Sequence, residues 1–274
     1  MKNKLSDYHI HTKYSTDSDE LAENIINSAI HKGLAEICFT DHIDYDYPST
    51  DENGNPEFVF NIPDYLNEYE PLRQKYEREI KVKIGVELGL MDSVLSKNEL
   101  TAANYPFDFI IGSSHLLDGE DPYYPEYWAN KTPDSVLEHY FLTTLKNVSS
   151  YNNYDIYGHL DYIVRYIPDK SYIYNHKKYM DIIDEILRKI IYNGHGIEIN
   201  TSSLAKGLSK PNPCIDIVRH YKSLGGEIIT LGSDAHIAEN VAFGFEKMRD
   251  ILLDCGFKYY TTFTARKAEF NKLD

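Results

Sequence analysis

Short apolar or β-branched runs alternate along this chain with longer segments of helical period. Seven of these runs predict strands, at residues 7–11, 35–40, 81–88, 107–115, 154–161, 195–201 and 227–236. Between them, residues 19–33 and 177–194 carry apolar side chains at helical spacing and end at Gly33 and Gly194, so both predict crossover helices. This α/β alternation is typical of βα units repeated around a parallel sheet or barrel.

Two insertions rich in Pro, Gly, Asp and aromatic residues interrupt the alternation, at residues 44–63 and 117–133. Each follows the C-terminal end of a predicted strand, where the loops of a barrel build its active face. Both are therefore expected to form walls or lids over a substrate. The alternative is a solvated surface excursion, which Trp128 and its neighbouring tyrosines disfavour for the second insertion.

Length, charge and cysteine content indicate the number of domains and exclude some classes of partner and metal site. The chain has 274 residues, enough for one large α/β domain, and we expect residues 1–274 to form it. Asp and Glu outnumber Lys and Arg by 43 to 28, so the net charge is −15 and nucleic acid is a poor default partner. The three cysteines lack CxxC spacing, so neither a disulfide framework nor a thiolate zinc site is indicated.

The sequence carries no sign of export or of membrane insertion. Only a few polar residues precede the first predicted strand, which leaves no room for a signal peptide. No apolar run approaches the length needed to span a bilayer. We therefore expect a cytoplasmic protein without a membrane partner, whose oligomeric state the sequence does not predict.

Metal-capable side chains stand at or near the ends of six of the seven predicted strands. Together with a carboxylate that follows the first strand, they are His9, His11, Asp17, His42, Glu87, His115, His159, Asp234 and His236. Residues two apart in a strand point to the same face, so His9 and His11 can meet one centre. The same spacing joins Asp234 to His236. Imidazole and carboxylate donors without thiolate suit Zn, Mn or Fe, and three ions that share Glu87 would use all nine residues.

The remaining five histidines provide an internal comparison. They lie in predicted helices or their flanks, or at the start of a strand: His31, His139, His176, His195 and His220. We interpret these five as structural or solvent-exposed. A single HxH pair would be weak support for a metal site, so the coincidence across six strand ends carries the prediction.

Seven short motifs together indicate a known family. In chain order they are DYHIHT, FTDH, GVELG, IGSSH, YGHLDYIVRY, EINTS and GSDAH, and they cover nearly the whole chain. This set resembles the polymerase and histidinol phosphatase (PHP) family. The long insertion after TDH and the arginine after GHLD most resemble its histidinol-phosphatase branch. The resemblance implies a distorted (β/α)7 TIM-like barrel with a trinuclear metal site at the C-terminal face of the strands.

The resemblance also implies a set of ligands for each ion. It places His9, His11, Glu87 and Asp234 on the first ion, Glu87, His115 and His159 on the second, and Asp17, His42 and His236 on the third. Some relatives have histidine at the position of Asp17, so the third ion can differ here in affinity or identity.

Adjacent divalent ions provide hydroxide at neutral pH and neutralise phosphate oxygens, which suits phosphoester hydrolysis. Amide hydrolysis is less favoured, because amidohydrolases commonly use a bridging lysine where this chain has Glu87. The resemblance favours Arg165 as a phosphate clamp over an ordinary ion pair. Asn200 is expected to contact substrate or metal-bound water, or to hold its loop. Asp17, His236 or water on the third ion would protonate the leaving group.

The donor set predicts a metal-dependent phosphomonoesterase. The resemblance implies that it converts L-histidinol phosphate, a small-molecule phosphate monoester, to L-histidinol and phosphate in histidine biosynthesis. The ammonium and imidazole of this substrate should meet acidic or aromatic groups of the two insertions. Asp41 and Asp161 adjoin predicted ligands and would orient imidazoles or cap helices. The alternative functions are a nucleotide phosphatase or exonuclease of the same family, against which the net acidity argues, and a metal-binding protein without catalysis.

Overall fold

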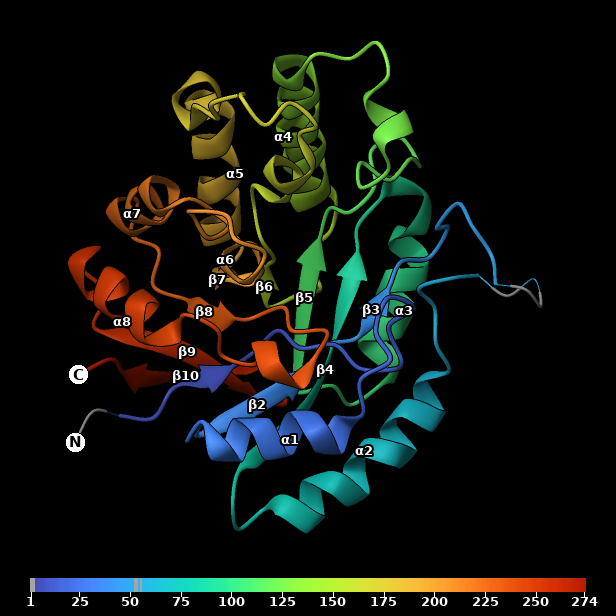
Figure 1. Ribbon diagram of the computed structural model, residues 1–274, viewed down its shortest axis with the longest axis vertical. Coiled ribbons are helices and arrows are strands. Elements are labelled where there is room, and N and C mark those ends of the chain that lie inside the picture. The colour runs from blue at the N-terminus through green and yellow to red at the C-terminus, as the bar shows by residue number, and fades with distance from the viewer. Residues whose placement is uncertain (1–2, 52–53, 55) are drawn as a thin grey trace.

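Parallel strands curl into a nearly closed barrel, with helices around them (Figure 1). The computed structural model describes residues 3–51, 54 and 56–274, so residues 52–53 and 55 of the first insertion lie outside the described part. The strand order is β1 (Ser6–Asp7), β2 (Glu36–Phe39), β4 (Lys81–Gly89), β5 (Phe109–Ser113), β6 (Ile156–Tyr157), β7 (Gly196–Asn200) and β8 (Ile229–Gly232). A two-residue strand, β3 (His42–Ile43), also pairs with β4.

Main-chain hydrogen bonds join the first segment of the barrel to the last. Tyr8 N donates to Leu231 O at 2.9 Å, and Asp234 N donates to His9 O at 2.7 Å. A parallel bridge between Ile10 and Ala235 continues the contact. All seven predicted strands are present, and the predicted distorted barrel is confirmed.

Four predicted strands extend too far at their C-terminal ends, and the first of them, β1, ends at Asp7, before His9 and His11. The ladders of β5, β6 and β8 end at Ser113, Tyr157 and Gly232, before the histidine or aspartate that each was expected to carry. Asp234 has a φ of 53°, in the left-handed region, so its backbone is not that of a strand. The prediction that strand alternation directs Asp234 and His236 to the same centre is therefore wrong. Both residues lie in a loop after β8, and the loop backbone sets the direction of their side chains.

Helices cover the outside of the barrel. Within the described residues they are α1 (Ala22–His31), α2 (Ile62–Tyr76), α3 (Leu95–Asn104), α4 (Pro133–Ser150), α5 (Met180–Tyr192), α6 (Ser202–Ala205), α7 (Ile215–Ser223) and α8 (Phe245–Asp254). The two helices predicted from periodicity are α1 and α5. Helix α5 buries Ile183, Ile186, Leu187 and Ile190, one apolar stripe of period 3.6. The same described residues contain no helix of the length and apolar character that would cross a membrane.

An antiparallel hairpin that the sequence did not predict, β9 (Tyr259–Thr264) and β10 (Lys267–Lys272), covers the N-terminal end of the barrel. Tyr8 Oη donates to Phe263 O at 3.0 Å, and Arg266 N donates to Asp108 O at 2.9 Å. Strand β10 is mostly exposed, so its sequence lacks an apolar alternation that would have revealed it. With this end closed, the cavity described below opens at the carboxyl ends of the strands.

The buried core lies largely between the strands and the helices. A smaller buried cluster joins residues of the strand segments to the hairpin: Tyr8, Cys38, Phe109, Ile111, Ile156 and Phe263. The three cysteines are buried and none is in a disulfide.

Candidate metal centre and cavity

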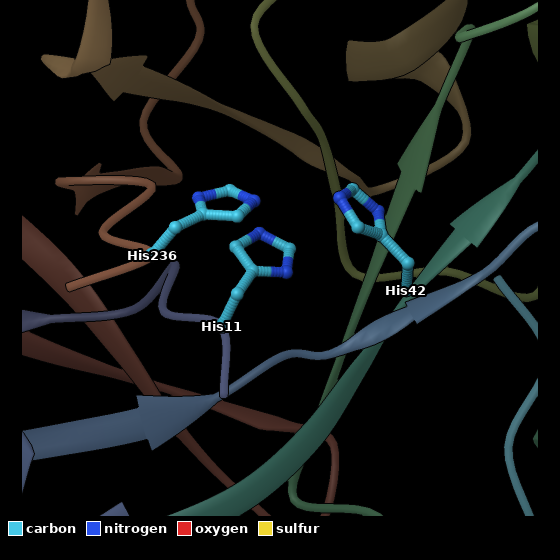
Figure 2. Close-up of side chains that lie close together, drawn as sticks. All are labelled: His11, His42 and His236. Carbon is cyan, nitrogen blue, oxygen red and sulfur yellow. The ribbon is translucent and has the colours of Figure 1, made fainter. Parts of the chain in front are cut away.

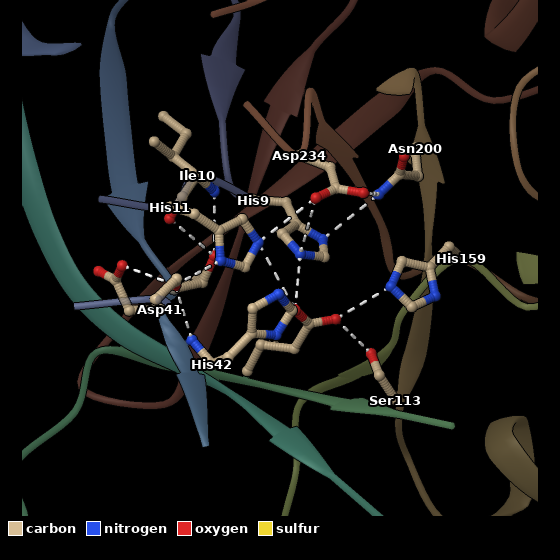
Figure 3. Close-up of polar contacts among 12 residues, drawn as sticks. His9, Ile10, His11, Asp41, His42, Ser113, His159, Asn200 and Asp234 are labelled. Carbon is tan, nitrogen blue, oxygen red and sulfur yellow. Dashed lines mark hydrogen bonds and ion pairs between the residues drawn. The ribbon is translucent and has the colours of Figure 1, made fainter. Parts of the chain in front are cut away.

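The nine side chains predicted as metal ligands lie together at the carboxyl end of the barrel. Figure 3 labels His9, His11, His42, His159 and Asp234 among them. They come from segments far apart in the sequence: His9 and His11 after β1, Asp17 before α1, His42 in β3, Glu87 in β4, His115 after β5, His159 after β6, and Asp234 and His236 after β8. Seven of them are buried, whereas His236 is partly exposed and Asp17 is exposed. The carboxyl ends of parallel strands meet at one end of a barrel, which explains the convergence.

Glu87 lies at the centre, with its two carboxylate oxygens facing different histidines. Oε2 is 3.1 Å from His9 Nε2 and 3.0 Å from His42 Nδ1. Oε1 is 3.2 Å from His115 Nε2 and 3.0 Å from His159 Nε2. A carboxylate whose oxygens serve separate groups of nitrogen donors is suited to bridge two cations.

His11 connects this centre to the partly exposed side of the cluster. Its Nε2 is 3.4 Å from Asp234 Oδ1. Its ring stacks on those of His42 and His236, with a centroid distance of 4.2 Å to each (Figure 2). Asp17 Oδ2 lies 3.1 Å from His236 Nε2, which brings a further carboxylate to this side.

The donor atoms of the cluster fit metal cations. Within each of four residue groups they lie no more than 4.8 Å apart: His9–His11–Asp234, His9–Glu87–His159, His42–Glu87–His115 and His11–His42–His236. Six buried atoms form no hydrogen bond, although several face another polar atom of the cluster at close range: Nε2 of His9, His11 and His236, Nδ1 of His42 and His159, and Oε2 of Glu87. Burying polar atoms without hydrogen bonds is costly, so those that face the cluster call for a ligand such as a metal ion. His159 is the exception in this list, because it faces Glu87 through Nε2.

The carboxylates of the cluster are held in their ionised form. Burial alone would raise the pKa of Glu87 and of Asp234, but adjacent imidazoles, and Arg165 in the case of Asp234, lower both well below the usual range. Partial loss of solvent around Asp17 would raise its pKa, but the adjacent imidazoles, His236 first, lower it. Burial alone would lower the pKa of His42, but Glu87 and Asp17 raise it to about 9. This concentration of buried negative charge favours cations.

Two carboxylates that the sequence analysis did not identify contact the Nδ1 atoms of cluster histidines, on the side of the ring away from Glu87. Glu198 Oε2 is 3.0 Å from His9 Nδ1, and Asp44 Oδ1 is 2.9 Å from His115 Nδ1. Such contacts fix the orientation of a metal-binding ring and raise its basicity. The sequence could have revealed Glu198 as a residue of the site. It stands two residues before Asn200 in β7 and therefore on the same face of that strand.

Asp41 and Asp161 have different surroundings. Ser15 Oγ donates to Asp41 Oδ1 at 2.8 Å and lies 2.9 Å from His11 Nδ1, so Asp41 orients an imidazole through Ser15. Asp161 Oδ1 accepts a hydrogen bond from Asn212 Nδ2 at 2.5 Å. It therefore holds the loop around Asn212.

Arg165, in the 3-10 helix η3 (Tyr162–Tyr166), lies beside the cluster and is held by three side chains. Its Nη1 donates to Asp234 Oδ2 at 2.9 Å, its Nη2 to Asn200 Oδ1 at 2.6 Å, and its Nε to Asn212 Oδ1 at 2.8 Å. A guanidinium has five N–H donors, so these bonds leave two for a ligand. Arg165 also lines the cavity described below.

Asn200 is fully buried, and it does not line that cavity. Its Oδ1 accepts from Arg165, while its Nδ2 donates to Glu198 Oε1 at 3.1 Å and to Asp234 Oδ2 at 3.2 Å. The geometry favours holding these neighbours over direct contact with a substrate.

A cavity of about 430 Å³ opens beside the cluster, with Arg165 and several of the candidate ligands in its wall. Both insertions contribute to it, as their position after strand ends predicted. The first supplies Asp44, Tyr47 and Phe58, and the second supplies Asp121, Tyr123 and Tyr124. The size suits a small molecule.

The five histidines set apart in the sequence stay outside every metal-capable group found among the described residues. His139 pairs with Asp118 at 2.9 Å and His220 with Asp184 at 2.7 Å. The ring of His195 packs against Tyr154, and burial lowers its pKa to about 4.

Comparison with known proteins identifies the class of protein. The model of the PHP domain matches residues 7–202, and the chain belongs to the PHP family. The relatives found over nearly its whole length are named histidinol-phosphatase or probable histidinol-phosphatase. That of Lactococcus lactis subsp. lactis is 35% identical over 272 residues, which cover 98% of each chain. A protein of Clostridium acetobutylicum, designated a probable histidinol-phosphatase, is 36% identical over 257 residues, 92% of this chain and 94% of that one.

A solved structure supports both the fold and the branch of the family. The crystal structure of histidinol phosphate phosphatase from Lactococcus lactis, in complex with Zn, L-histidinol and phosphate, has a TM-score of 0.90 and 34% sequence identity. The match covers 97% of this chain and 99% of that one.

Proposed function

We propose that this protein is a metal-dependent phosphomonoesterase that hydrolyses L-histidinol phosphate to L-histidinol and phosphate. The observation that carries the proposal is Glu87 between two sets of histidines, with Arg165 beside them in the wall of one small cavity. The likeness to histidinol-phosphatases over nearly the full chain supports this substrate, since one of them has been solved with L-histidinol and phosphate.

Three divalent ions, drawn from Zn, Mn and Fe, are the proposed cofactors. The proposed ligands are His9, His11, Glu87 and Asp234 for the first, Glu87, His115 and His159 for the second, and Asp17, His42 and His236 for the third. The buried donor atoms without hydrogen bonds support this set. His42 Nδ1 also lies 3.0 Å from Glu87 Oε2, so His42 is close to the proposed bridging carboxylate as well as to His11 and His236. When bound, such ions supply an activated water at neutral pH and neutralise phosphate oxygens.

The protein's own groups position the phosphate. Arg165 is proposed to donate its two remaining N–H groups to phosphate oxygens, a planar two-point contact that a lysine cannot make. Asn200 and Asn212 hold the guanidinium in place through the two hydrogen bonds they accept. Asn200 is thus assigned to positioning Arg165.

Asp17 and His236 are proposed to bind the third ion and also to lie next to the leaving group of the substrate. Both line the cavity, and His236 Nε2 faces Asp17 Oδ2. Burial alone would lower the pKa of His236, but Asp17 raises it. The proton for the leaving alkoxide is assigned to this side of the cavity: to Asp17, to His236 when it does not bind the third ion, or to water on that ion.

Substrate competition tests the proposed function. We expect metal-replete protein to hydrolyse L-histidinol phosphate with a kcat/KM about 100-fold or more above those for p-nitrophenyl phosphate and nucleoside monophosphates. Single-stranded DNA should not be degraded. An equal or greater kcat/KM for a nucleotide would overturn the assignment, and a metal-replete protein inert toward all phosphoesters would replace it with metal binding alone.

Glu198 gives a test of the metal centre that leaves every proposed ligand in place. Glu198→Gln keeps the size of the side chain but removes the charge behind His9, so metal affinity should fall by about 10- to 100-fold. Competition with a chelator would measure this fall. Glu185→Gln, on the exposed side of α5, is the matched control and should retain wild-type affinity. Unchanged affinity in Glu198→Gln would show that the contact with His9 does not tune the site.

A further inference from the structure

One carboxylate in the cavity wall is not engaged with the histidine cluster. Four carboxylates line the cavity: Asp17, Asp44, Asp121 and Asp234. Asp17 and Asp234 contact cluster histidines directly, and Asp44 holds His115 Nδ1. Of the four, Asp121 alone has no such contact among the described interactions, so its charge is free to serve another purpose.

Both insertions hold Asp121 in place. Tyr47 Oη, from the first insertion, donates to Asp121 Oδ2 at 2.7 Å. Tyr123 N, from the second, donates to Asp121 Oδ1 at 2.8 Å. A carboxylate offers about four acceptor positions, so these two bonds fix the group and leave acceptors for a ligand. Fixing it beforehand lowers the entropy lost on binding.

Aromatic rings separate Asp121 from the cluster along one side of the cavity. The ring of Phe58 lies 5.5 Å from that of His42 and 4.5 Å from that of Tyr47. Tyr47 in turn donates a hydrogen bond to Asp121. A chain of contacts therefore connects His42 to Asp121 through the rings of Phe58 and Tyr47.

A second aromatic path leads from the cluster along η3. The ring of Tyr162 lies 4.7 Å from that of His159 and 5.0 Å from that of Tyr166, and the guanidinium of Arg165 lies 5.3 Å from the Tyr162 ring. The ring of Tyr166 lies 5.6 Å from that of Tyr123, next to which Asp121 is held. Chains of neighbouring aromatic rings therefore lead from the cluster to the surroundings of Asp121 along both sides of the cavity.

We propose that Asp121 determines substrate specificity by accepting a hydrogen bond from the imidazole N–H of the substrate. This inference rests on the proposed function, because it assumes a phosphate held by the cluster and Arg165. The imidazole is the end of L-histidinol phosphate opposite the phosphate, whereas its ammonium is on the carbon next to the phosphate-bearing methylene and stays nearer the cluster. Tyrosine and phenylalanine faces between the two ends provide stacking surface for the imidazole.

Two substrates that differ in the ring test the role of Asp121. L-phenylalaninol phosphate keeps the ammonium and the phosphate but has no ring N–H. We expect wild-type protein to prefer L-histidinol phosphate in kcat/KM by about 10- to 100-fold, the usual range for a hydrogen bond to a charged group. In Asp121→Ala this preference should fall to about threefold or less, chiefly through loss of activity on L-histidinol phosphate.

The control is Glu120→Ala, which removes the neighbouring carboxylate, an exposed side chain that pairs with Lys131 and does not line the main cavity. Its preference should match that of wild type. Asp121→Asn keeps the shape and one acceptor, so its preference should lie between those of wild type and Asp121→Ala. Metal content, measured in each variant, should not change.

The outcomes separate this inference from the proposed function. Wild-type protein that fails to hydrolyse L-histidinol phosphate, yet cleaves other phosphoesters, would overturn the proposed function. Wild-type preference that persists in Asp121→Ala would overturn only the role of Asp121. Equal losses on both substrates, as a displaced loop would produce, would also overturn that role, because the carboxylate would then not discriminate between the rings.

Discussion

Replacing Glu87 by alanine should reduce kcat/KM for L-histidinol phosphate by at least about 1,000-fold and lower the number of bound ions per chain, because two-metal catalysis needs both cations in place. Each oxygen of Glu87 faces a different pair of histidines, so one substitution removes a ligand from two proposed positions. Elemental analysis and steady-state kinetics on the same preparation would measure both effects.

Two further variants make the Glu87 result specific. Glu87→Gln keeps the volume of the buried side chain, so a loss of metal in this variant cannot come from a cavity in the core. Glu185→Ala removes an exposed glutamate and should leave both metal content and activity at wild-type values. Full metal occupancy in a correctly folded Glu87 variant would contradict the proposed bridge.

Replacing Arg165 by alanine should lower kcat/KM by about 100- to 1,000-fold, the usual cost of removing a preorganised donor to a developing charge. Metal content should be largely retained, since Arg165 is not a proposed ligand. The reason is geometric: Asp234, Asn200 and Asn212 hold the guanidinium in the cavity wall. Kinetics and elemental analysis together would separate this result from that for Glu87.

Arg165→Lys and Arg188→Ala provide the comparisons. Lysine keeps the charge but cannot form the same planar fork, so much of the loss should remain. Arg188 is exposed on α5, where it pairs with Asp184, and its removal should leave kcat/KM unchanged. Loss of metal with Arg165→Ala would show instead that the arginine acts mainly by holding Asp234.

The part of the site that was predictable came from residues at strand ends. Parallel strands place their carboxyl ends together, so His9, Glu87 and His115 could be assigned to one region from the order of the strands alone. Strand alternation failed at Asp234, whose left-handed backbone follows the end of β8. The ligands were recognisable by residue type, whereas the backbone that aims them was not.

The groups that were missed act through contacts between distant segments. Asp44 meets His115 across 71 positions of the sequence, and Glu198 meets His9 across 189. The hairpin β9–β10 was missed for a related reason, because its exposed outer strand carries no apolar period. Local periodicity reports which face of an element is buried and contains no information about its partner.

By itself, the sequence determined the alternation of strands and helices, the donor chemistry of the strand ends and the family, because each is written in residue types and short spacings. Only the tertiary structure decided that the two oxygens of Glu87 face separate sets of histidines, that Asn200 holds Arg165, and that Tyr47 of the first insertion holds Asp121 of the second. These features depend on distances between segments far apart in the chain. Such distances are set by how the strands register and how the loops pack.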